Sequence, residues 1–392
     1  MRILFSVIAA AILISCSPKG IVLDKNVPAG NIVFERMVND TVYLHQELRG
    51  SKKAWFYWAF RVKGAQGRTL TFAFTKSNCV SARGPVVSLD RGATYEYLAE
   101  EGATKRSFTY TFPKDAREVW FYECHPYTPE MWESFLRSQR GAQFETGVLC
   151  QSRKGRDVPF FRITPQTVAP RLSVVMSARH HCSEASAEYV VEGFTATFLE
   201  DSELGAWLRE NVELIVVPFV DMDGAVDGDQ GKWRLPHDHN RDYTEFRYPE
   251  TTALAGIIAE TQPQIFIDIH NPGLRHFQVY TPYREDMSAM EPIFSALLEK
   301  YQEGGLNYST TDDLPFGVSW NTAKNYTDGK SSAKWVGENI KSIQISRTIE
   351  IPFTHANGTL VYPSNMRKFG HGLARTLRAY VEEAEEMAQV AE

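Results

Sequence analysis

The pattern of apolar residues changes near residue 150, and this change limits the possible folds more than any other feature of the sequence. Before it, residues 31–141 contain short runs rich in aromatic and β-branched residues, separated by Gly, Pro, Asp and Asn. Residues 69–74 form one such run, and residues 107–112 alternate polar with aromatic side chains. Several short strands at this spacing predict an antiparallel β-sandwich. Its aromatic residues are expected to form a packed core rather than a ligand platform.

In the second half, apolar strands alternate with helical patterns. Strands are predicted at residues 173–176, 214–217 and 265–269, and helical periodicity occurs at residues 185–199 and 251–260. This alternation indicates an α/β domain whose sheet is largely buried. Ligands in such domains bind at the carboxyl ends of the strands, so polar residues just after the strands are the candidate site residues.

The composition is that of a globular protein. The chain has 392 residues, of which 43% are hydrophobic and 23% charged, and this length suits about two domains. The net charge is −6 and no dense Lys/Arg run occurs, so nucleic acid is not an expected partner. We predict a β-sandwich over residues 21–149 and an α/β domain over residues 150–392.

The first 20 residues have the features of an export signal and a short linker. Met1-Arg2 is followed by an apolar segment to Ser15, which is too short for a confident membrane span. The sequence Leu13-Ile14-Ser15-Cys16 resembles a bacterial lipobox, which implies that Cys16 is lipidated. The expectation is an exported, membrane-anchored lipoprotein in the periplasm or at the cell surface. The alternative is an ordinary signal peptide with a chance cysteine.

The other cysteines leave the disulfide state open. They are Cys79, Cys124, Cys150 and Cys182. In an oxidising compartment they could form one or two disulfides, and four cysteines allow three full pairings. Free buried thiols are an equally weighted alternative.

A candidate metal site is spread along the α/β domain. His181 and Glu184 form an H-x-x-E pair after a predicted strand, and the offset of three puts both side chains on one side of a helical turn. His270 directly follows the predicted apolar strand at residues 265–269. Two histidines, one glutamate and an open fourth position are the pattern of catalytic zinc. The alternative is a surface histidine and a strand-end hydrogen-bonding histidine.

Glu350 is the candidate general base. It lies in an alternating strand at residues 345–351, so that a carboxylate is placed on a mostly apolar element. It could take a proton from a zinc-bound water. The structural alternative is an ion-paired strand glutamate.

With these residues in view, residues 150–380 resemble the zinc metallocarboxypeptidases of the carboxypeptidase A-like family. His181-Cys182-Ser183-Glu184 resembles the first metal motif, with Cys-Ser where Pro-Gly is usual. Ile267-Asp268-Ile269-His270 resembles the motif of the third ligand, and Thr348-Ile349-Glu350 that of the catalytic glutamate. The resemblance implies a central mixed sheet flanked by helices, one Zn²⁺ per chain and a peptide substrate with a free C-terminal carboxylate.

The stretch from Trp233-Arg234 to Asp238-His239-Asn240-Arg241 resembles the family's arginine plus D-x-N-R motif. By this resemblance, Asn240 and Arg241 bind the terminal carboxylate, which a planar guanidinium can hold through two parallel bonds. Arg234 is expected to stabilise the oxyanion. Asp238 is expected to support a ligand histidine, His181, from behind. An ordinary polar loop is the alternative.

One substrate-capping tyrosine is less well defined. Tyr326 precedes Trp335 by nine residues, a spacing similar to that of the family's mobile tyrosine, but Tyr301 and Tyr308 lie in the same poorly matched region.

The first domain adds a hint about the branch of the family. A β-sandwich that ends in residues 123–128, before the peptidase domain, resembles the cytosolic carboxypeptidase branch. The export signal departs from the cytosolic branch, so the resemblance does not extend to the substrates of that branch.

The sequence is compatible with three functions. The leading one is an exported zinc exopeptidase that hydrolyses the C-terminal peptide or isopeptide bond. A zinc amidohydrolase acting on acyl amino acids or cell-wall peptides is the second, because fold does not fix the reaction. A non-catalytic lipoprotein that binds peptides or glycans is the third. Glu350 and Arg234 argue against it, because binding alone needs neither a base nor an oxyanion donor.

Overall fold

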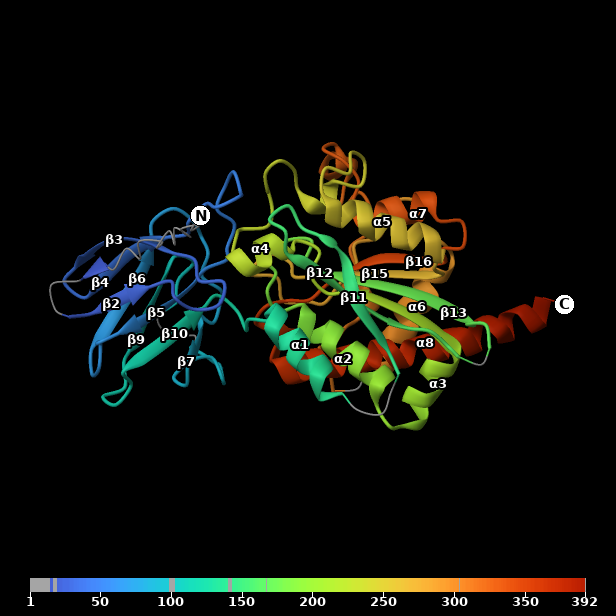
Figure 1. Ribbon diagram of the computed structural model, residues 1–392, viewed down its shortest axis with the longest axis horizontal. Helices are drawn as coiled ribbons and strands as arrows, with labels where there is room; N and C mark the ends of the chain where they lie inside the picture. Colours follow the sequence, from blue (N-terminus) through green and yellow to red (C-terminus); the bar gives the residue numbers. More distant parts are fainter. Residues whose placement is uncertain are drawn as a thin grey trace, which may run out of the picture.

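The computed structural model describes residues 15–16, 20–98, 103–139, 143–166, 168–302 and 304–391, with no side-chain description after residue 383. A β-sandwich packs against a larger α/β unit (Figure 1). The predicted export signal lies largely outside the described residues, and lipidation at Cys16 stays a prediction. No helix in the described ranges is both long and apolar enough to cross a membrane.

The first unit is a sandwich of two sheets. One sheet has the order β1-β2-β5-β10-β7-β8 and is antiparallel throughout; the other has the order β3-β4-β6-β9, with β4 and β6 parallel and the other pairs antiparallel. The strands of the first sheet are β1 (Ser15–Cys16), β2 (Val22–Asp24), β5 (Ala59–Lys63), β10 (Glu118–Tyr122), β7 (Val86–Ser88) and β8 (Glu96–Tyr97). Those of the second are β3 (Val33–Val38), β4 (Thr41–His45), β6 (Thr69–Phe74) and β9 (Ser107–Thr111).

The aromatic residues of the sandwich form a packed core, as predicted. Trp58, Phe60, Phe72, Phe108 and Phe121 are all fully buried. The Phe72 ring lies 5.0 Å from that of Phe108 and 5.5 Å from that of Phe121, measured between centroids. Alternate residues of β6 point into this core because side chains on a strand alternate between its faces.

The second unit is built on a mixed sheet in the order β11-β12-β14-β13-β15-β16. The pairs β14–β13, β13–β15 and β15–β16 are parallel, and β11 and β12 join antiparallel at one edge. The strands are β11 (Glu145–Gln151), β12 (Asp157–Ile163), β13 (Leu172–Ala178), β14 (Val212–Val217), β15 (Ile265–His270) and β16 (Ile345–Glu350), and a hairpin of β17 (His355–Ala356) and β18 (Thr359–Leu360) follows.

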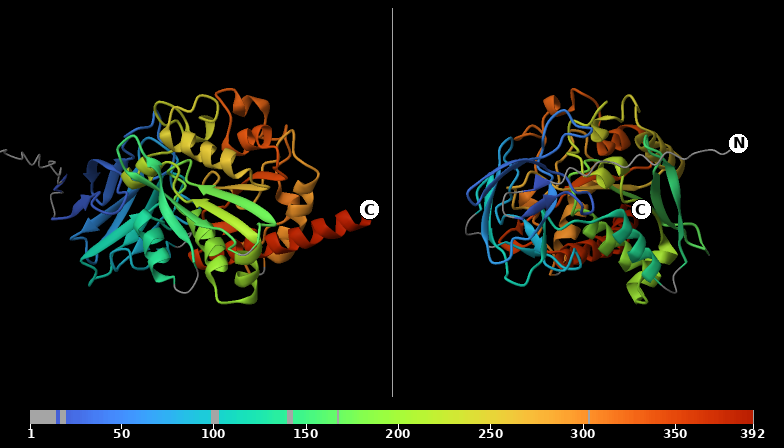
Figure 2. Two further views of the ribbon diagram at one scale, coloured as in Figure 1. Left: turned by 45° about the vertical axis from the view of Figure 1, so that its right-hand side comes forward. Right: turned by 60° about the vertical axis from the view of Figure 1, so that its left-hand side comes forward.

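Helices cover both faces of this sheet (Figures 1 and 2). Val174 and Met176 of β13 face one helical layer, and Val175 faces the other. The first layer contains α2 (Glu188–Leu199), α3 (Glu203–Asn211), α6 (Met290–Tyr301) and α8 (Pro363–Ala391); the second contains α5 (Pro249–Thr261) and α7 (Ser332–Asn339). Shorter elements are α4 (Met222–Asp227), η1 (His239–Arg241), η2 (Thr310–Asp312) and η3 (Ala323–Tyr326). Because both faces are covered, every residue of β13 is buried.

The segment between β10 of the sandwich and β11 of the mixed sheet packs with the α/β unit. Helix α1 (Pro129–Ser138) carries Trp132, which is 1% exposed and belongs to the same core as Phe161 of β12. Strand β11 begins at Glu145 and pairs with β12. The predicted boundary at residue 150 therefore cuts through β11. We propose instead a boundary between β10 and α1.

The two units share a hydrogen-bonded interface. The buried Gln230 side chain donates to the carbonyl oxygen of Tyr57 (2.9 Å) and accepts from the backbone N–H of Trp55 (3.0 Å). The Tyr97 hydroxyl donates to the Phe353 carbonyl oxygen (2.6 Å). Residues 55–58 precede β5, and the backbone groups of Trp55 and Tyr57 make these contacts with the α/β unit.

The four cysteines left open by the sequence are all free thiols. Cys79, Cys124 and Cys182 are buried, and Cys150 is half-buried. Burial raises the pKa of the Cys79 thiol to about 12, so this thiol remains protonated and unreactive near neutral pH.

Candidate active site

Neighbouring parallel strands end at one edge of the α/β sheet, and the predicted metal ligands lie there. Strand β13 leads into the loop that carries His181 and Glu184, and β15 ends at His270. Strand β16 ends at Glu350, and the β15–β16 register pairs His270 with Glu350. The carboxyl ends of parallel strands are where α/β sheets bind ligands.

His181, Glu184 and His270 direct three donor atoms at one another. The Nδ1 atom of His181 lies 2.8 Å from Oε1 of Glu184, and Nδ1 of His270 lies 2.7 Å from Oε2 of Glu184. One donor atom from each residue lies within 4.8 Å of the other two. All three side chains are buried. Two imidazole nitrogens and one carboxylate form the donor set of catalytic zinc sites that keep a fourth position open.

An aspartate holds each histidine from behind. Nε2 of His181 lies 3.2 Å from Oδ1 of Asp238, the contact expected from the sequence, and Nε2 of His270 lies 2.7 Å from Oδ2 of Asp268. When Nε2–H donates to the aspartate, the Nδ1 lone pair of the ring is free for a metal.

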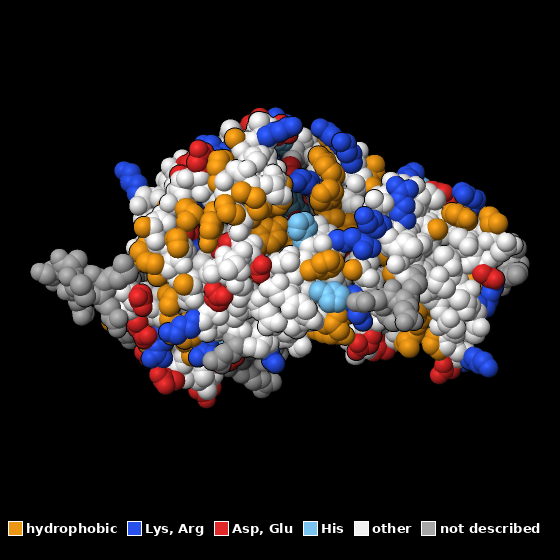
Figure 3. Space-filling model, turned by 180° about the vertical axis from the view of Figure 1, so that it is seen from behind, with side chains coloured by type: hydrophobic (Ala, Val, Ile, Leu, Met, Phe, Trp, Pro, Cys, Tyr) orange, Lys and Arg blue, Asp and Glu red, His pale blue; other side chains and the backbone are white. Residues whose placement is uncertain are grey.

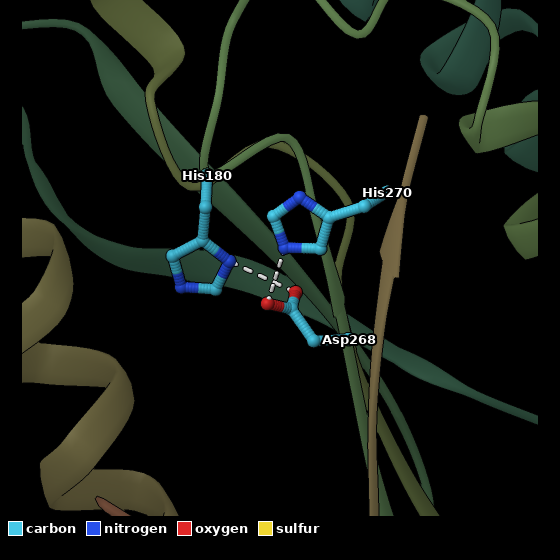
Figure 4. A group of neighbouring side chains, drawn as sticks. All are labelled: His180, Asp268 and His270. Carbon is cyan, nitrogen blue, oxygen red and sulfur yellow. Dashed lines mark hydrogen bonds and ion pairs between the residues drawn. The ribbon is translucent and has the colours of Figure 1, made fainter. Parts of the chain in front are cut away.

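Asp268 is the centre of a buried hydrogen-bond network (Figure 4). Besides His270, it contacts Nδ1 of His180 (2.8 Å) and accepts from the hydroxyls of Ser177 (2.8 Å) and Ser332 (2.8 Å). His180, Asp268 and His270 also meet the spacing of a metal cluster. Because both carboxylate oxygens already receive hydrogen bonds, we interpret this group as a support for His270 rather than a second ion site.

The charges of the ligand cluster fit a divalent cation. Burial alone would lower the pKa of His181, but Glu184 and Asp238 raise it to about 9. Asp268 and Glu184 likewise outweigh burial and raise the pKa of His270 well above its usual value. Burial opposes ionisation of Glu184, yet the two histidines lower its pKa to about 2. The carboxylates thus hold positive charge on both rings, and a cation placed between the Nδ1 atoms supplies the same charge.

Glu350 faces this cluster with an unpaired carboxylate oxygen. Its Oε2 atom is buried and has no hydrogen-bond partner among the described residues. Burial and the nearby charge of Glu184 raise the pKa of Glu350 to about 7, although His270 acts in the opposite direction. A carboxyl group with this pKa can both accept and return a proton near neutral pH.

A cleft opens above the cluster, and Figure 3 shows it as a hollow bordered by hydrophobic side chains with a histidine at its edge. Its lining includes the three ligands and Glu350. Other lining residues are Trp55, Lys232, Asn240, Arg241, Asn271, Pro272, Gly273, His276, Tyr280, Pro282, Trp320, Asn325, Tyr326, Ser331 and Thr348.

Asn240 and Arg241 lie in this lining, on η1. The Arg241 guanidinium donates from Nε to the Asn325 carbonyl oxygen (2.9 Å) and from Nη1 to the Asn240 carbonyl oxygen (2.5 Å). The Asn240 amide contacts Nε2 of His270 (3.1 Å) and accepts from the backbone N–H of Ser332 (2.9 Å). Arg241 is thus held by backbone groups, with no carboxylate of the described residues paired to it.

The structure distinguishes the three candidate tyrosines. Tyr326 lines the cleft, and its ring lies 5.1 Å below the Arg241 guanidinium. Tyr308 is buried and donates to Oδ2 of Asp313 (2.7 Å), and the Tyr301 ring lies 5.2 Å from the Lys300 ammonium; neither tyrosine lines the cleft.

Arg234 is the residue predicted to stabilise the oxyanion. It does not line the cleft. Its guanidinium is 8% exposed and is enclosed by Asp221 (Nε–Oδ2 2.8 Å, Nη2–Oδ1 3.0 Å) and Asp229 (Nη1–Oδ2 2.5 Å). A Cβ atom on Gly50 of the sandwich would lie 2.2 Å from Nη1 of Arg234. Hydrogen bonds from Nη1 and Nη2 to the two carboxylates, with the sandwich packed against it, hold the Arg234 guanidinium outside the cleft lining; its Nε–H has no hydrogen-bond partner among the described residues.

Several lining or supporting residues were not predicted. Asp268 had a signal, because it lies two residues before His270 on the same strand face. Tyr280 pairs its backbone with Glu350, a contact that no sequence pattern indicates. Trp55 comes from the sandwich domain, and Lys232 lies two residues before Arg234, the predicted oxyanion donor.

The fold and this site define a class. The chain has the fold of the metallo-carboxypeptidases, preceded by a β-sandwich. It superposes on a metallo-carboxypeptidase from Burkholderia cenocepacia with a TM-score of 0.77 at 19% identity, covering 93% of this chain and 99% of that one. A metallo-carboxypeptidase from Pseudomonas aeruginosa, in complex with (2-guanidinoethylmercapto)succinic acid, gives a TM-score of 0.76 at 20% identity, covering 92% and 99%.

In sequence, the chain is similar to cytosolic carboxypeptidases. It is 26% identical to cytosolic carboxypeptidase 2 of Danio rerio over 226 residues, which are 52% of this chain and 31% of that protein. It is 31% identical to cytosolic carboxypeptidase 2 of Homo sapiens over 147 residues, 35% of this chain and 16% of that protein. The matches thus span about a third or less of these relatives. No protein-family model matches the chain.

Proposed function

We propose that this protein is a zinc-dependent exopeptidase that hydrolyses the C-terminal peptide or isopeptide bond of peptides. The observation that carries the proposal is the convergence of His181, Glu184 and His270 beside the unpaired carboxylate of Glu350, in a cleft that also contains Arg241. The metallo-carboxypeptidase fold and the cytosolic carboxypeptidase homologues support the same class of reaction.

Each side chain has a role in this proposal. Zinc held by His181, Glu184 and His270 would supply a Lewis acid that polarises the scissile carbonyl. Glu350 takes a proton from the attacking water and passes it to the leaving amine. Arg241, with Asn240 beside it, binds the terminal carboxylate of the substrate. Tyr326 covers the bound residue from the side of the cleft.

The reaction class is tested with matched peptides that differ only at the C-terminus. The zinc-loaded protein is incubated with a peptide as its free acid and as its amide, and the products are identified by mass spectrometry. We expect stepwise loss of C-terminal residues from the free acid alone. Equal cleavage of both would favour an amidohydrolase, and binding without cleavage would favour a peptide-binding protein.

Arg241→Ala is expected to weaken substrate binding more than chemistry. The guanidinium contacts a carboxylate that takes no part in the making or breaking of bonds, so KM should rise by about 10–100-fold, the equivalent of a charge-assisted pair of about 1.5–3 kcal/mol, while kcat changes less. Steady-state kinetics on the free-acid peptide measure both constants. Arg378→Ala, on the distant helix α8, is the control. An unchanged KM in the Arg241 variant would remove this residue from the binding site.

We also propose that the protein is exported and anchored by a lipid on Cys16. The support is the sequence of residues 1–16 and the lipobox-like Leu13-Ile14-Ser15-Cys16. In bacterial expression, Cys16→Ser is expected to abolish lipid labelling and either move the protein from the membrane fraction to the soluble fraction or block its processing. Fractionation and intact mass measure this. A variant that still partitions with the membrane, correctly processed and without lipid, would contradict the anchor.

A further inference from the structure

The cleft contains a cation that the proposed roles leave unused. Lys232 lines the cleft together with Glu350 and the metal ligands. Its side chain is half-buried. In the described part of the chain, its ammonium forms no ion pair, and it lies 5.5 Å from the centre of the Trp55 ring. An unpaired lysine beside a catalytic carboxylate is available to a charge that develops on the substrate.

The backbone brings Lys232 to the metal ligands. Gly231 has φ +77°, and a Cβ atom there would lie 2.8 Å from the backbone nitrogen of Cys182 and 3.0 Å from the carbonyl carbon of His181. Only glycine fits this close approach. The residue that follows therefore emerges beside the ligand loop. Trp233 also has a positive φ, of 58°, so the chain turns sharply on both sides of Lys232.

The electrostatics of the two candidate cations differ. Arg234 is enclosed by Asp221 and Asp229, so this buried group of one cation and two carboxylates has a net charge of −1 (1 − 2). His239, also near Asp221, does not offset it, because burial lowers its pKa to about 4. Such a group would repel a developing oxyanion. Lys232, in contrast, lines the cleft together with Glu350, and no carboxylate of the described residues is paired with its ammonium.

We propose that Lys232, rather than Arg234, stabilises the negative charge that develops on the carbonyl oxygen of the scissile bond. This inference rests on the proposed peptidase function. As water adds to the carbonyl carbon, the C–O π bond breaks and its electron pair moves to the oxygen. The ammonium of Lys232 faces that charge. When the C–N bond breaks, the pair returns to the carbonyl and the proton held by Glu350 goes to the leaving amine, so no further reactant is needed.

The sandwich domain takes part in this arrangement. Trp55 precedes β5, and its indole contacts the lysine ammonium across the domain interface. Cation–π contacts hold an ammonium without neutralising its charge. Trp55 therefore limits the positions that the ammonium can take at the end of its flexible four-carbon stem. A carboxylate partner would also limit them, but it would compensate the positive charge.

Lys232→Met is the principal test, because methionine keeps much of the length and loses the charge. Removing one oxyanion donor typically costs about 10²–10³-fold in kcat, so we expect a decrease of that size with KM and zinc content near the wild-type values. Lys232→Arg is expected to recover most of the activity. Lys53→Met is the matched control: the Lys53 ammonium also lies over an indole, 5.3 Å from Trp233, but Lys53 does not line the cleft.

A binding measurement gives a readout that is independent of turnover. A phosphinic peptide carries a tetrahedral anionic group at the position of the scissile carbonyl and so resembles the transition state. By calorimetry, we expect Lys232→Met to weaken its binding by about the same factor as kcat, while binding of the product amino acid changes little. Unchanged affinity for the phosphinic peptide would overturn the proposal.

The Arg234→Met variant distinguishes the role of Arg234 from that of Lys232. It leaves two buried carboxylates without their partner, so a lower melting temperature, by roughly 5 °C or more, is the expected result. Suppose instead that Arg234→Met kept its melting temperature and lost kcat, while Lys232→Met was fully active; Arg234 would then be the oxyanion donor. If the wild-type protein binds zinc but cleaves no peptide, the proposed peptidase function is wrong. If the wild type and the Lys232→Met variant are equally active, only the proposed role of Lys232 is wrong.

Discussion

Glu350→Gln is expected to lower kcat by at least about 10²–10⁴-fold, the usual contribution of general acid–base catalysis. Glutamine keeps the size and shape of the side chain but cannot accept a proton from the attacking water. The Oε2 atom of Glu350 has no partner in the described structure and its carboxyl has a pKa of about 7, so the substitution breaks no hydrogen bond to this oxygen. Zinc content, melting temperature and KM should therefore stay close to wild type.

Single-turnover rates on one peptide, with zinc measured in the same samples, check this expectation. Glu203→Gln is a suitable control, because it makes the same chemical change at an exposed position on α3. If Glu350→Gln hydrolysed the peptide at the wild-type rate, Glu350 would not be the base. If it lost zinc, Glu350 would be a ligand instead.

His270→Ala is expected to abolish stoichiometric zinc binding. It removes one of three protein donors and leaves Glu184 and Asp268 without the ring between them. Changes to outer partners of a ligand typically cost 10–100-fold in metal affinity, so the loss of the ligand itself should exceed about 100-fold. Asp268→Asn should fall within the 10–100-fold range, because the ring stays but loses its charged support.

Metal analysis after dialysis against a zinc buffer measures both affinities. His371→Ala on α8 is the control, since His371 is 41% exposed and far in sequence from the cluster. The fold should survive in His270→Ala, because an α/β core of this size does not depend on one ion. Full zinc occupancy in that variant would place the ion elsewhere in the molecule.

The strands and the ligands could be predicted because both depend on local patterns. Apolar runs marked β13, β15 and β16, and the polar residues at their ends had to meet at one sheet edge once the strands were parallel. The contact between Asp238 and His181 was predicted only through the family resemblance, since 57 residues separate them.

Lys232 could not be predicted, because its position depends on a close approach between distant segments. Gly231 packs against the ligand loop near His181, and Gly50 of the sandwich abuts Arg234. Neither contact leaves a periodic signal in the sequence. The residue type of Arg234 matches the family motif, whereas the three-dimensional structure places Lys232 in the cleft. The contact between Trp55 and the Lys232 ammonium could not be predicted for the same reason.

The most direct test of the proposed zinc-dependent exopeptidase activity is a zinc titration of the metal-free protein with the release of C-terminal residues as the readout. Chelated and dialysed protein at a known concentration receives increasing Zn²⁺, and bound zinc and the rate of release are measured at each step. We predict negligible release without metal, a linear rise with bound zinc, and a break at one equivalent per chain. Full activity in the metal-free protein, or one bound zinc without release from any free-acid peptide, would contradict it.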